Sequence, residues 1–298
     1  MSLNTNYAKE YSRELSQAFP YVLYFGDLYN TPNNGRYRWV NAKTIEIPIV
    51  ETTGRKDANR DTIMAAAKRH GNSWETKTLE NERFWDTLIH PMDIDQTNLV
   101  LSIANITKVY NEEQKFPEMD AYTISKLYTL WTAQSKTAST DALDATNILN
   151  KFDSMMEKMD NARVPAAGRI LYVTPSTNTL LKNAKDIVRN ISVDKAGATS
   201  MQRTVSRIDE VKIVVVPDQL MKTAYDFTEG WTDGVSAKQI YMALIHPVSV
   251  ITPVSYESAC LDEPCAKTQN KYYYYEESFE DVFILNKKAD GLDFVIEA

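Results

Sequence analysis

The sequence predicts an α+β protein in which strands and helices follow one another in mixed order. Three observations carry this prediction: a strand-like alternation of apolar residues near the start, a long central stretch with helical spacing, and alternating strands and helices from residue 165 onward. At 298 residues the chain can bury a sizeable core, as one large domain or as two smaller ones. Its hydrophobic fraction of 43% and charged fraction of 24% are typical of folded proteins.

Residues 1–42 make up the first segment, in which we expect an aromatic-rich arm. A short helix over about residues 6–18 precedes turn formers at Thr31–Gly35, and little periodic pattern follows. The segment either packs on its own domain or lies across a neighbouring subunit, and the sequence leaves both interpretations open. Its aromatic residues include Phe19, Tyr21, Tyr24, Phe25, Tyr29, Tyr37 and Trp39.

Residues 43–93 are expected to form an extended two-stranded excursion. Apolar Ile45, Ile47 and Ile49 alternate with polar or turn residues, which is the period of a strand with one buried face. The stretch from Trp74 to Thr87 is polar and partly strand-like, and a charged segment lies between the two. Since so polar a pair of strands has no core of its own, we expect a partner subunit to stabilise it.

Helical spacing dominates the centre of the chain, over residues 94–115 and 117–136, with Pro117 predicted to break or kink the helix between them. A third helix is predicted from about Asp141, capped by Ser139–Asp141. Its methionines are interpreted as core filler. The apolar face of this helix comprises Leu143, Ile148, Phe152, Met155, Met156 and Met159.

From residue 165 the pattern alternates between strand and helix. Pro217 ends one predicted strand, and His246–Pro247 is predicted to bend another pair. The predicted elements are a strand at 169–174, a helix from 175 to about 189, strands at 211–216 and 240–254, a long strand at 271–286 and a final short strand after Gly291.

Composition disfavours several classes of function. A formal net charge of −7 removes the general electrostatic attraction to nucleic acid, so any DNA contact would be local and non-specific. No apolar run is long enough to span a membrane, and the polar start lacks a signal peptide's apolar stretch, so we expect a protein made and kept in a cytoplasm. Cys260 and Cys265 are too few for a disulfide framework and form a poor zinc site without a nearby histidine.

Catalytic motifs are absent from the sequence: there is no P-loop and no GxGxxG, GxSxG or HExxH. The best metal-like cluster is His90 with Asp93 and Asp95, but Asp95 with Thr97 or Asn98 could equally cap the following helix, which is the favoured interpretation.

Two further clusters at the C-terminal end have alternative explanations. Four carboxylates at 276, 277, 280 and 281 could serve acid–base chemistry, yet on a strand they alternate between faces, which favours a solvated or intersubunit surface. Tyr272–Tyr275 could stack on bases, but no Lys or Arg is interleaved with them, which favours an interface or core. We therefore predict no catalytic, cofactor-binding or metal site, and no cofactor.

Four stretches of the second half, in their order and spacing, resemble a known family. They are Val164–Pro165 with Gly168–Pro175, then Val205–Asp209 leading into Val211–Pro217, then Ile240–His246, and finally Tyr272–Asn286 with Lys287, Lys288 and Gly291. This order is similar to that of the major capsid proteins of tailed bacteriophages, whose fold (the Johnson fold) is shared with herpesvirus capsids and with encapsulin shells. Residues 140–298 carry most of the resemblance, and the first 140 resemble the family in architecture only.

The resemblance implies a fold with five parts. These are an N-terminal arm (1–42), an extended two-stranded loop (43–93), a peripheral domain with a long spine helix (94–140), a mixed axial domain (141–255) and a return to the peripheral domain (256–298). It places the centre of a capsomer near 190–205 and 218–234.

The implied function is structural and not enzymatic. A major capsid protein self-assembles through hexamers and pentamers into the icosahedral head of the virion, which encloses a double-stranded DNA genome and is assembled in the host bacterial cytoplasm. The resemblance implies other copies of the chain as partners. It also allows for separate scaffolding, portal and decoration proteins. The expected intersubunit contacts are Trp39, Arg55, Arg60, Trp74, Phe84 and Trp85.

Three alternatives stay open. An encapsulin-like nanocompartment shell has the same fold but holds protein cargo. A soluble α+β enzyme would need a convergent site that the sequence does not show. A binding module is weakly indicated by the tyrosines.

Overall fold

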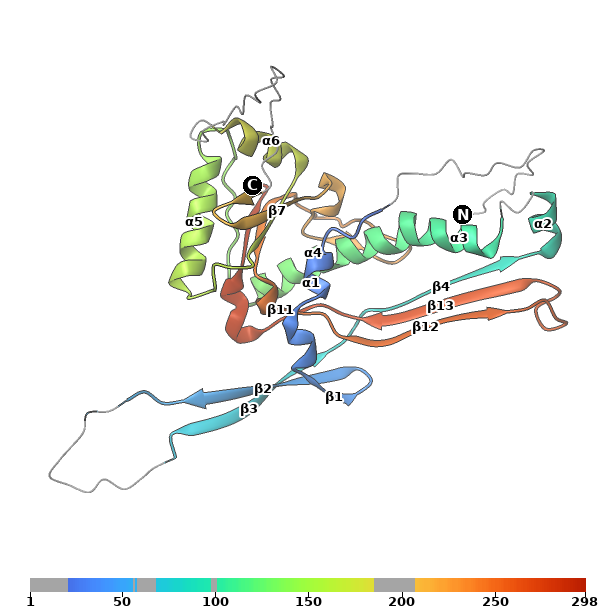
Figure 1. The fold of residues 1–298 in the computed structure, drawn as a ribbon, viewed down its shortest axis with the longest axis horizontal. Helices are drawn as coiled ribbons and strands as arrows, with labels where there is room; N and C mark the ends of the chain where they lie inside the picture. The colour runs from blue at the N-terminus through green and yellow to red at the C-terminus, as the bar shows by residue number, and fades with distance from the viewer. Residues whose placement is uncertain (1–20, 56, 58–67, 98–100, 185–206) are drawn as a thin grey trace, which may run out of the picture.

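The computed structural model describes residues 21–55, 57, 68–97, 101–184 and 207–298. The helix expected over 6–18, Arg60 and the expected tip at 190–205 lie outside these residues. Figure 1 shows an elongated molecule with three parts. A sheet with α5 and α6 forms one end, a long helix and a ribbon of three strands run side by side away from it, and the β2–β3 hairpin projects separately.

The five-stranded sheet holds the centre of the core. Its strands are apolar along both faces, so alternate side chains enter two different cores. Tyr172 of β5 packs with Phe25 and Phe294, whereas Leu171 and Val173 face the opposite side. The strands are β5 (Ile170–Val173), β6 (Arg207–Ile208), β7 (Val211–Val215), β10 (Ile240–Ile245) and β15 (Leu292–Ile296), in the order β15-β10-β5-β7-β6.

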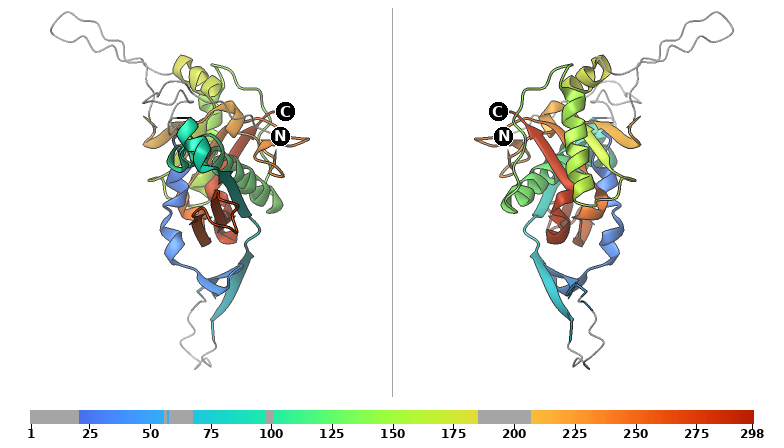
Figure 2. Two further views of the ribbon diagram at one scale, coloured as in Figure 1. Left: turned by 90° about the vertical axis from the view of Figure 1, so that its right-hand side faces the viewer. Right: turned by 90° about the vertical axis from the view of Figure 1, so that its left-hand side faces the viewer.

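Helices α5 (Ile148–Asn161) and α6 (Pro175–Asn183) lie on one side of this sheet (Figure 2). The buried residues of α5 are spaced for one helical face, as predicted, and its buried methionines do fill the core. The predicted start near residue 141 was wrong. Asp144 accepts hydrogen bonds from the backbone N–H groups of Thr146 (2.7 Å) and Asn147 (2.9 Å), and the helix begins after that turn.

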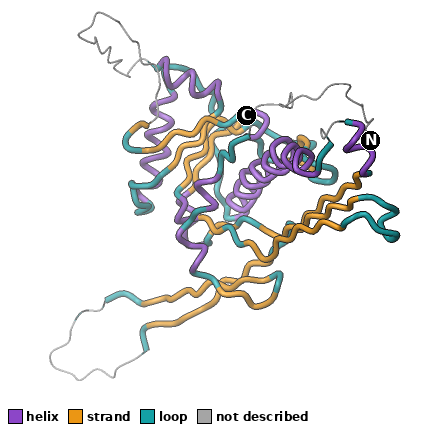
Figure 3. Tube along the Cα trace, turned by 45° about the vertical axis from the view of Figure 1, so that its right-hand side comes forward, coloured by secondary structure: helices purple, strands orange, loops and turns teal. Residues whose placement is uncertain are grey.

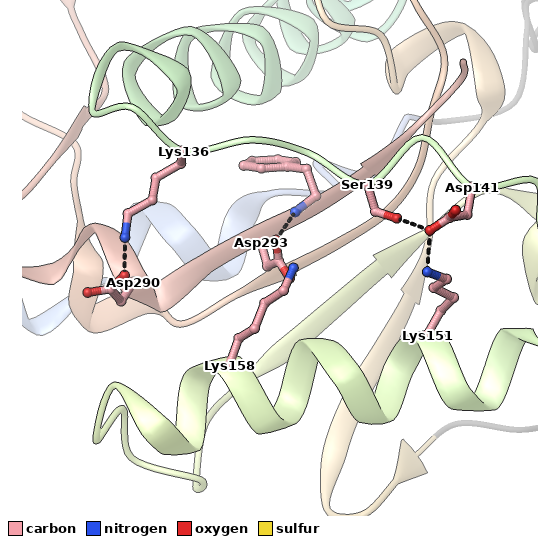
Figure 4. A network of polar contacts seen from close by, with 8 residues as sticks. Lys136, Ser139, Asp141, Lys151, Lys158, Asp290 and Asp293 are labelled. Atoms are coloured by element: carbon pink, nitrogen blue, oxygen red, sulfur yellow. Dashed lines mark hydrogen bonds and ion pairs between the residues drawn. The ribbon is translucent and has the colours of Figure 1, made fainter.

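Three lysine–aspartate pairs join α5, the chain before it and the C-terminal end of the chain (Figure 4). Lys158 of α5 pairs with Asp293 of β15, with 2.8 Å between Nζ and Oδ2. Asp293 is only 4% exposed, and burial raises its pKa. Ser139, predicted as a cap, is instead bridged to β15 at Val295. The other two pairs are Lys151 with Asp141 and Lys136 with Asp290.

The central helical region forms one long rod, not two helices separated at Pro117. Helix α3 (Ile103–Tyr110) continues through a π-helical turn, η2 (Asn111–Lys115), into α4 (Phe116–Ala133). Proline lacks the N–H that an α-helix needs, and the wider π-helical turn before Pro117 accommodates it without ending the rod. The predicted start at residue 94 was also wrong, because a short helix α2 (Pro91–Gln96) comes first and Ser102 caps α3.

The ribbon beside this rod has the order β12-β13-β4. Its strands are β12 (Val254–Asp262), β13 (Tyr272–Glu280) and β4 (Glu82–Ile89), all antiparallel. Figure 3 shows the long helix lying along the ribbon. Because β4 belongs here, the excursion predicted over 43–93 is shorter than expected.

The projecting hairpin consists of β2 (Thr44–Thr52) and β3 (His70–Thr78), with the short β1 (Arg38–Asn41) paired to the start of β2. The strand predicted from Ile45, Ile47 and Ile49 is therefore confirmed. Ile45 and Ile47 pack at the hairpin root against Phe279 and Ile251. Among the described residues of the hairpin, only those at its root share a hydrophobic core with the rest of the molecule.

The described part of the N-terminal segment packs on its own chain. Phe25 and Leu28 are fully buried, and the Phe25 ring lies 4.6 Å from that of Tyr172. Of the two open interpretations, packing on the same domain is confirmed for these residues. The segment contains α1 (Gly26–Tyr29) and the turn η1 (Pro32–Gly35).

The last part of the chain contributes strands to the three-stranded ribbon and to the five-stranded sheet. The bend predicted at His246–Pro247 is confirmed, since β10 ends there and a turn, η4 (Pro247–Ser249), leads on. The final strand β15 pairs with β10, so the expected return over 256–298 is corrected: it covers strands of two sheets. The smaller elements are η3 (Asp218–Leu220), β8 (Tyr225–Asp226), β9 (Thr232–Asp233), β11 (Val250–Ile251), β14 (Phe283–Ile284) and η5 (Asn286–Gly291).

Candidate assembly surfaces

One buried carboxylate on the long helix holds the N-terminal segment. Asp120 of α4 is 0% exposed and accepts hydrogen bonds from the Tyr21 hydroxyl (2.5 Å) and the backbone N–H groups of Tyr24 (2.9 Å) and Phe25 (3.1 Å). Burial raises the pKa of Asp120 to about 6, since it penalises the charged form by more than the three donors favour it. No pattern in the sequence distinguishes Asp120 from a solvated helix carboxylate, so sequence reasoning missed it.

Arg169 fixes the turn between α5 and β5 from inside the protein. Its guanidinium donates to the carbonyls of Val164 (2.6 Å) and Pro165 (3.0 Å) and to Asp160 (2.6 Å). The side chain of Arg169 is 0% exposed, whereas that of Asp160 is 63% exposed. The arginine thus satisfies carbonyl groups of the turn that follows α5.

Polar contacts tie the long helix to the inner face of the ribbon. Arg83 of β4 donates to Glu118 of α4 (2.7 Å) and to the carbonyl of Phe227 (2.6 Å). Lys115 of the π-helical turn pairs with Glu276 of β13. These pairs fix the register of helix against ribbon along its length.

Three of the four C-terminal carboxylates lie on β13, with Glu276 and Glu280 on one face and Glu277 on the other, and the fourth follows its end. Not all of them are solvated. Glu277 lies on the outer face and accepts the Tyr275 hydroxyl (2.9 Å). Asp281 is 2% exposed and accepts from Tyr122 (2.8 Å) and from the backbone N–H of Glu80 (2.9 Å). Burial raises the pKa of Asp281, so the expectation of a solvated group fails there.

The structure separates the expected contact residues into two groups. Trp85 faces inward and stacks on Tyr110 of α3, with ring centroids 4.0 Å apart. Phe84, one residue earlier, points outward and is 69% exposed. The two tryptophans of the hairpin are 40% (Trp39) and 43% (Trp74) exposed, and Arg55 is exposed near its end.

An open groove of about 530 Å³ lies at the hairpin root. Its apolar wall comes from Ile47–Val50 of β2 with Ile251 and Leu285, and Lys287 and Lys288 add positive charge. Lys287 pairs with Glu51 across the surface (2.9 Å).

The cluster of His90, Asp93 and Asp95 lies at the N-terminus of helix α2 and within that helix. The Nδ1 atom of His90 accepts the backbone N–H of Met92 (3.2 Å), so His90 itself caps α2. The favoured interpretation was wrong about the capping residue: Asp95 lies inside α2 and Ser102 caps the following helix α3, while Asn98 lies outside the described residues. Across the residues described, no three His, Cys, Asp or Glu side chains are grouped to hold a metal ion, and Cys260 and Cys265 are exposed thiols.

Within the described ranges, none of the helices has the length and apolar character needed to cross a membrane.

A long helix along a three-stranded ribbon, a mixed five-stranded sheet and a projecting hairpin together define the fold of phage capsid chains. A chain of the mature capsid of bacteriophage PhiM1 superimposes with a TM-score of 0.66 at 15% identity, covering 98% of this chain and 92% of that one. The capsid of cyanophage P-SCSP1u gives 0.64 at 12% identity, covering 98% and 93%. The capsid of a native GTA particle gives 0.60 at 10% identity, covering 98% and 95%.

No protein-family model and no curated protein matches the sequence. The resemblance drawn from the second half of the sequence is confirmed at the level of fold, and the structural match extends it over nearly the whole chain.

Proposed function

We propose that this chain is the major capsid protein of a tailed bacteriophage or of a related GTA particle. The observation that supports this most is the extent of the structural match, which covers nearly all of this chain and more than nine-tenths of each capsid chain compared. A shared module inside an unrelated protein would cover only a part. The protein then functions in the virion, where copies assemble through hexamers and pentamers into an icosahedral head around double-stranded DNA.

Under this proposal the parts of the fold take the roles that the sequence suggested. The β2–β3 hairpin corresponds to the extended loop, α3–α4 to the spine helix, and the five-stranded sheet to the axial domain, with its tip near 218–234. Trp39 and Trp74 are proposed as intersubunit contacts because they are large, aromatic and exposed, and Phe84, which is also exposed, is proposed as a contact on the outer face of the ribbon. Arg55 and Arg60 stay proposed contacts on charge alone, and Trp85 would contribute by holding the ribbon rigid.

A structural role also agrees with the chemistry of the described surface. Its polar clusters cap helices or join elements of the fold. DNA inside such a shell would meet a net negative protein, so its contacts would be local and non-specific. Scaffolding, portal and decoration proteins are proposed partners.

The first test is electron microscopy with light scattering on the purified full chain. Uniform hollow shells, tubes, or rings of five or six subunits are expected. Trp74→Ser should reduce assembly, and Met92→Ser is the matched control, an exposed apolar residue on α2. A chain that stays monomeric or dimeric at high concentration, even beside the products of its neighbouring genes, would overturn the proposal.

An encapsulin-like shell is the second candidate, since that family shares the fold. Particles produced with the neighbouring genes distinguish the two: nuclease-protected DNA supports a phage head, and an enclosed protein cargo supports a nanocompartment.

A further inference from the structure

The outer edge of the three-stranded ribbon carries little of the usual protection against strand pairing. Strand β12 spans nine residues and, in the described chain, pairs only with β13. Seven of the nine are exposed, and Val254–Asp262 contains no proline, lysine or arginine. Its only irregularity lies at the Val254 end. Natural edge strands are commonly blocked by such residues or by bulges, so this edge is open to an added strand.

The outer face of the same ribbon presents a row of aromatic rings. Register places Phe84 and Leu88 of β4 on one face with Tyr273 and Tyr275 of β13. The rings of Phe84 and Tyr275 stack at 6.2 Å, and those of Tyr275 and Tyr273 at 6.4 Å. Phe84 is 69% and Leu88 56% exposed, so much of this apolar surface faces solvent in the isolated chain.

Carboxylates gather on this face beside the rings. Asp86 of β4, Glu277 of β13 and Asp262 of β12 share the face with the aromatic row, whereas Glu82 already pairs with Lys43 (3.2 Å). The only Lys or Arg in the three strands is Arg83, which points to the helix side and pairs with Glu118. A cation arriving from outside would therefore meet carboxylates and ring faces together, an arrangement that favours Lys or Arg.

Small side chains keep the row accessible from the edge. Ser258 lies opposite Glu277, and Cys260 lies opposite Tyr275, between the edge and the rings. A strand added beside β12 would run roughly 10 Å from β13, a distance that the long side chain of Lys or Arg can bridge.

We propose that the β12 edge and the aromatic face form a docking site for an extended segment of a different protein. The segment pairs its backbone with β12 and alternates Lys or Arg with apolar residues. The cations of the segment lie over the carboxylates and the tyrosine rings. The ribbon recognises the segment by strand addition, in which an extended peptide pairs with an exposed sheet edge. The setting, a protein attached to a shell, rests on the proposed function.

The described part of this chain does not supply a matching strand. The other long strands with an unpaired edge are β3 and β4. The one lysine of β3, Lys77, pairs with Glu75 and its side chain is only 15% exposed, and the one arginine of β4, Arg83, pairs with Glu118. A second copy of this chain is the alternative occupant of the docking site. The particle-formation experiment distinguishes a second copy from a different protein.

The experiment uses the full chain and a fluorescent nonapeptide of alternating Lys and Val, with binding measured by fluorescence anisotropy. Two further peptides are compared: one with Glu in place of Lys, and one of the same sequence with alternate backbone amides methylated. The Lys–Val peptide should bind, the Glu–Val peptide should not, and methylation should weaken binding at least about tenfold because it removes the backbone donors at constant charge.

Protein variants locate the site. Ala259→Lys places a blocking lysine on β12, and Ser73→Lys is the matched control, because it adds the same charge to exposed β3. Ala259→Lys should weaken binding about tenfold relative to Ser73→Lys, and a double variant with Tyr275→Ser and Phe84→Ser should weaken it similarly. Equal binding of methylated and unmodified peptides, or equal binding by the two lysine variants, would overturn the proposal.

Particle formation is scored separately. If Ala259→Lys abolishes particles and Ser73→Lys does not, the edge joins copies of this chain, and a different protein is excluded as its occupant. If the unaltered protein forms no particles, the proposed function fails while the peptide result still decides the docking site.

Discussion

Replacing Asp120 by alanine should loosen the N-terminal segment from the long helix. The change leaves the buried N–H groups of Tyr24 and Phe25 without acceptors, and each such group costs about 1–3 kcal/mol. The ionised carboxylate is itself unfavourable here, because its pKa of about 6 lies roughly two units above the usual 3.8, which corresponds to roughly 3 kcal/mol at pH 7. The two effects oppose one another: a cost of about 2–6 kcal/mol for the two N–H groups against a gain of roughly 3 kcal/mol leaves a net loss of at most about 3 kcal/mol at pH 7.

The pH dependence gives the sharper test. Between about pH 4 and 6 the folded protein binds a proton at Asp120 that the unfolded chain does not, so stability rises as pH falls through this window and is lost as pH rises through 6. The unaltered protein should gain about 1 kcal/mol from pH 6 to pH 5 through this group, and Asp120→Ala should lack that gain. Other buried carboxylates with raised pKa act in both proteins alike and cancel in the difference.

Hydrogen exchange on the unassembled protein, followed by mass spectrometry on the peptide 21–29 at pH 5, 6 and 7, measures the opening free energy of this segment. Asp27→Ala is the matched control: it removes a carboxylate from the same segment whose partner is Lys212 on the exposed surface, and it should change opening by less than about 0.5 kcal/mol. Equal protection in Asp120→Ala and Asp27→Ala, or a pH-independent difference between Asp120→Ala and the unaltered protein, would refute the anchoring role.

Two further predictions concern packing. Alanine at Gly291 would place its Cβ 1.9 Å from Oγ and 2.9 Å from Cβ of the buried Ser249, so Gly291→Ala should cost about 2–4 kcal/mol in urea unfolding. Adding Ser249→Gly should restore most of that loss, while Gly35→Ala, which meets nothing within 4 Å, should be near neutral. Trp85→Ala should cost about 2–4 kcal/mol through its lost stack, and Phe84→Ala less than about 0.5 kcal/mol in the unassembled protein. Similar losses at positions 84 and 85 would contradict the assignment of faces.

Much of the second half could be predicted because its elements are bounded by local signals. The strands at 170–173 and 211–215 are apolar runs that end at prolines or caps, and such runs form strands whatever surrounds them. The apolar face of α5 follows directly from its spacing. Its start could not be predicted, because Ser139 and Asp144 are both plausible caps and tertiary pairing with β15 decides between them.

The central region shows where local reasoning fails. Pro117 in isolation predicts a break, yet the rod continues because a π-helical turn precedes the proline and the ribbon holds both halves through Arg83 and Lys115. Likewise Asp120 and Asp281 look solvated in the sequence, and only packing from residues about 100 or more positions away buries them. Partners so distant leave no spacing pattern.

The core and the projections divide the molecule into parts that differ in how they are stabilised. Strands β5, β10 and β15 of the five-stranded sheet are buried on both faces by the chain's own helices and N-terminal segment, so they need no partner to exclude water. The hairpin beyond Ile47 has no such cover: Val50 and Trp74 are 68% and 43% exposed, and burying each large apolar side chain yields about 1.5–3 kcal/mol only when something else covers it. In a lone chain the conformational entropy lost on ordering such a segment is therefore not offset by burial of apolar surface. In a shell every copy both covers a neighbour and is covered by one, so that surface is buried. The distribution of apolar surface, more than any single residue, is what ties this fold to assembly.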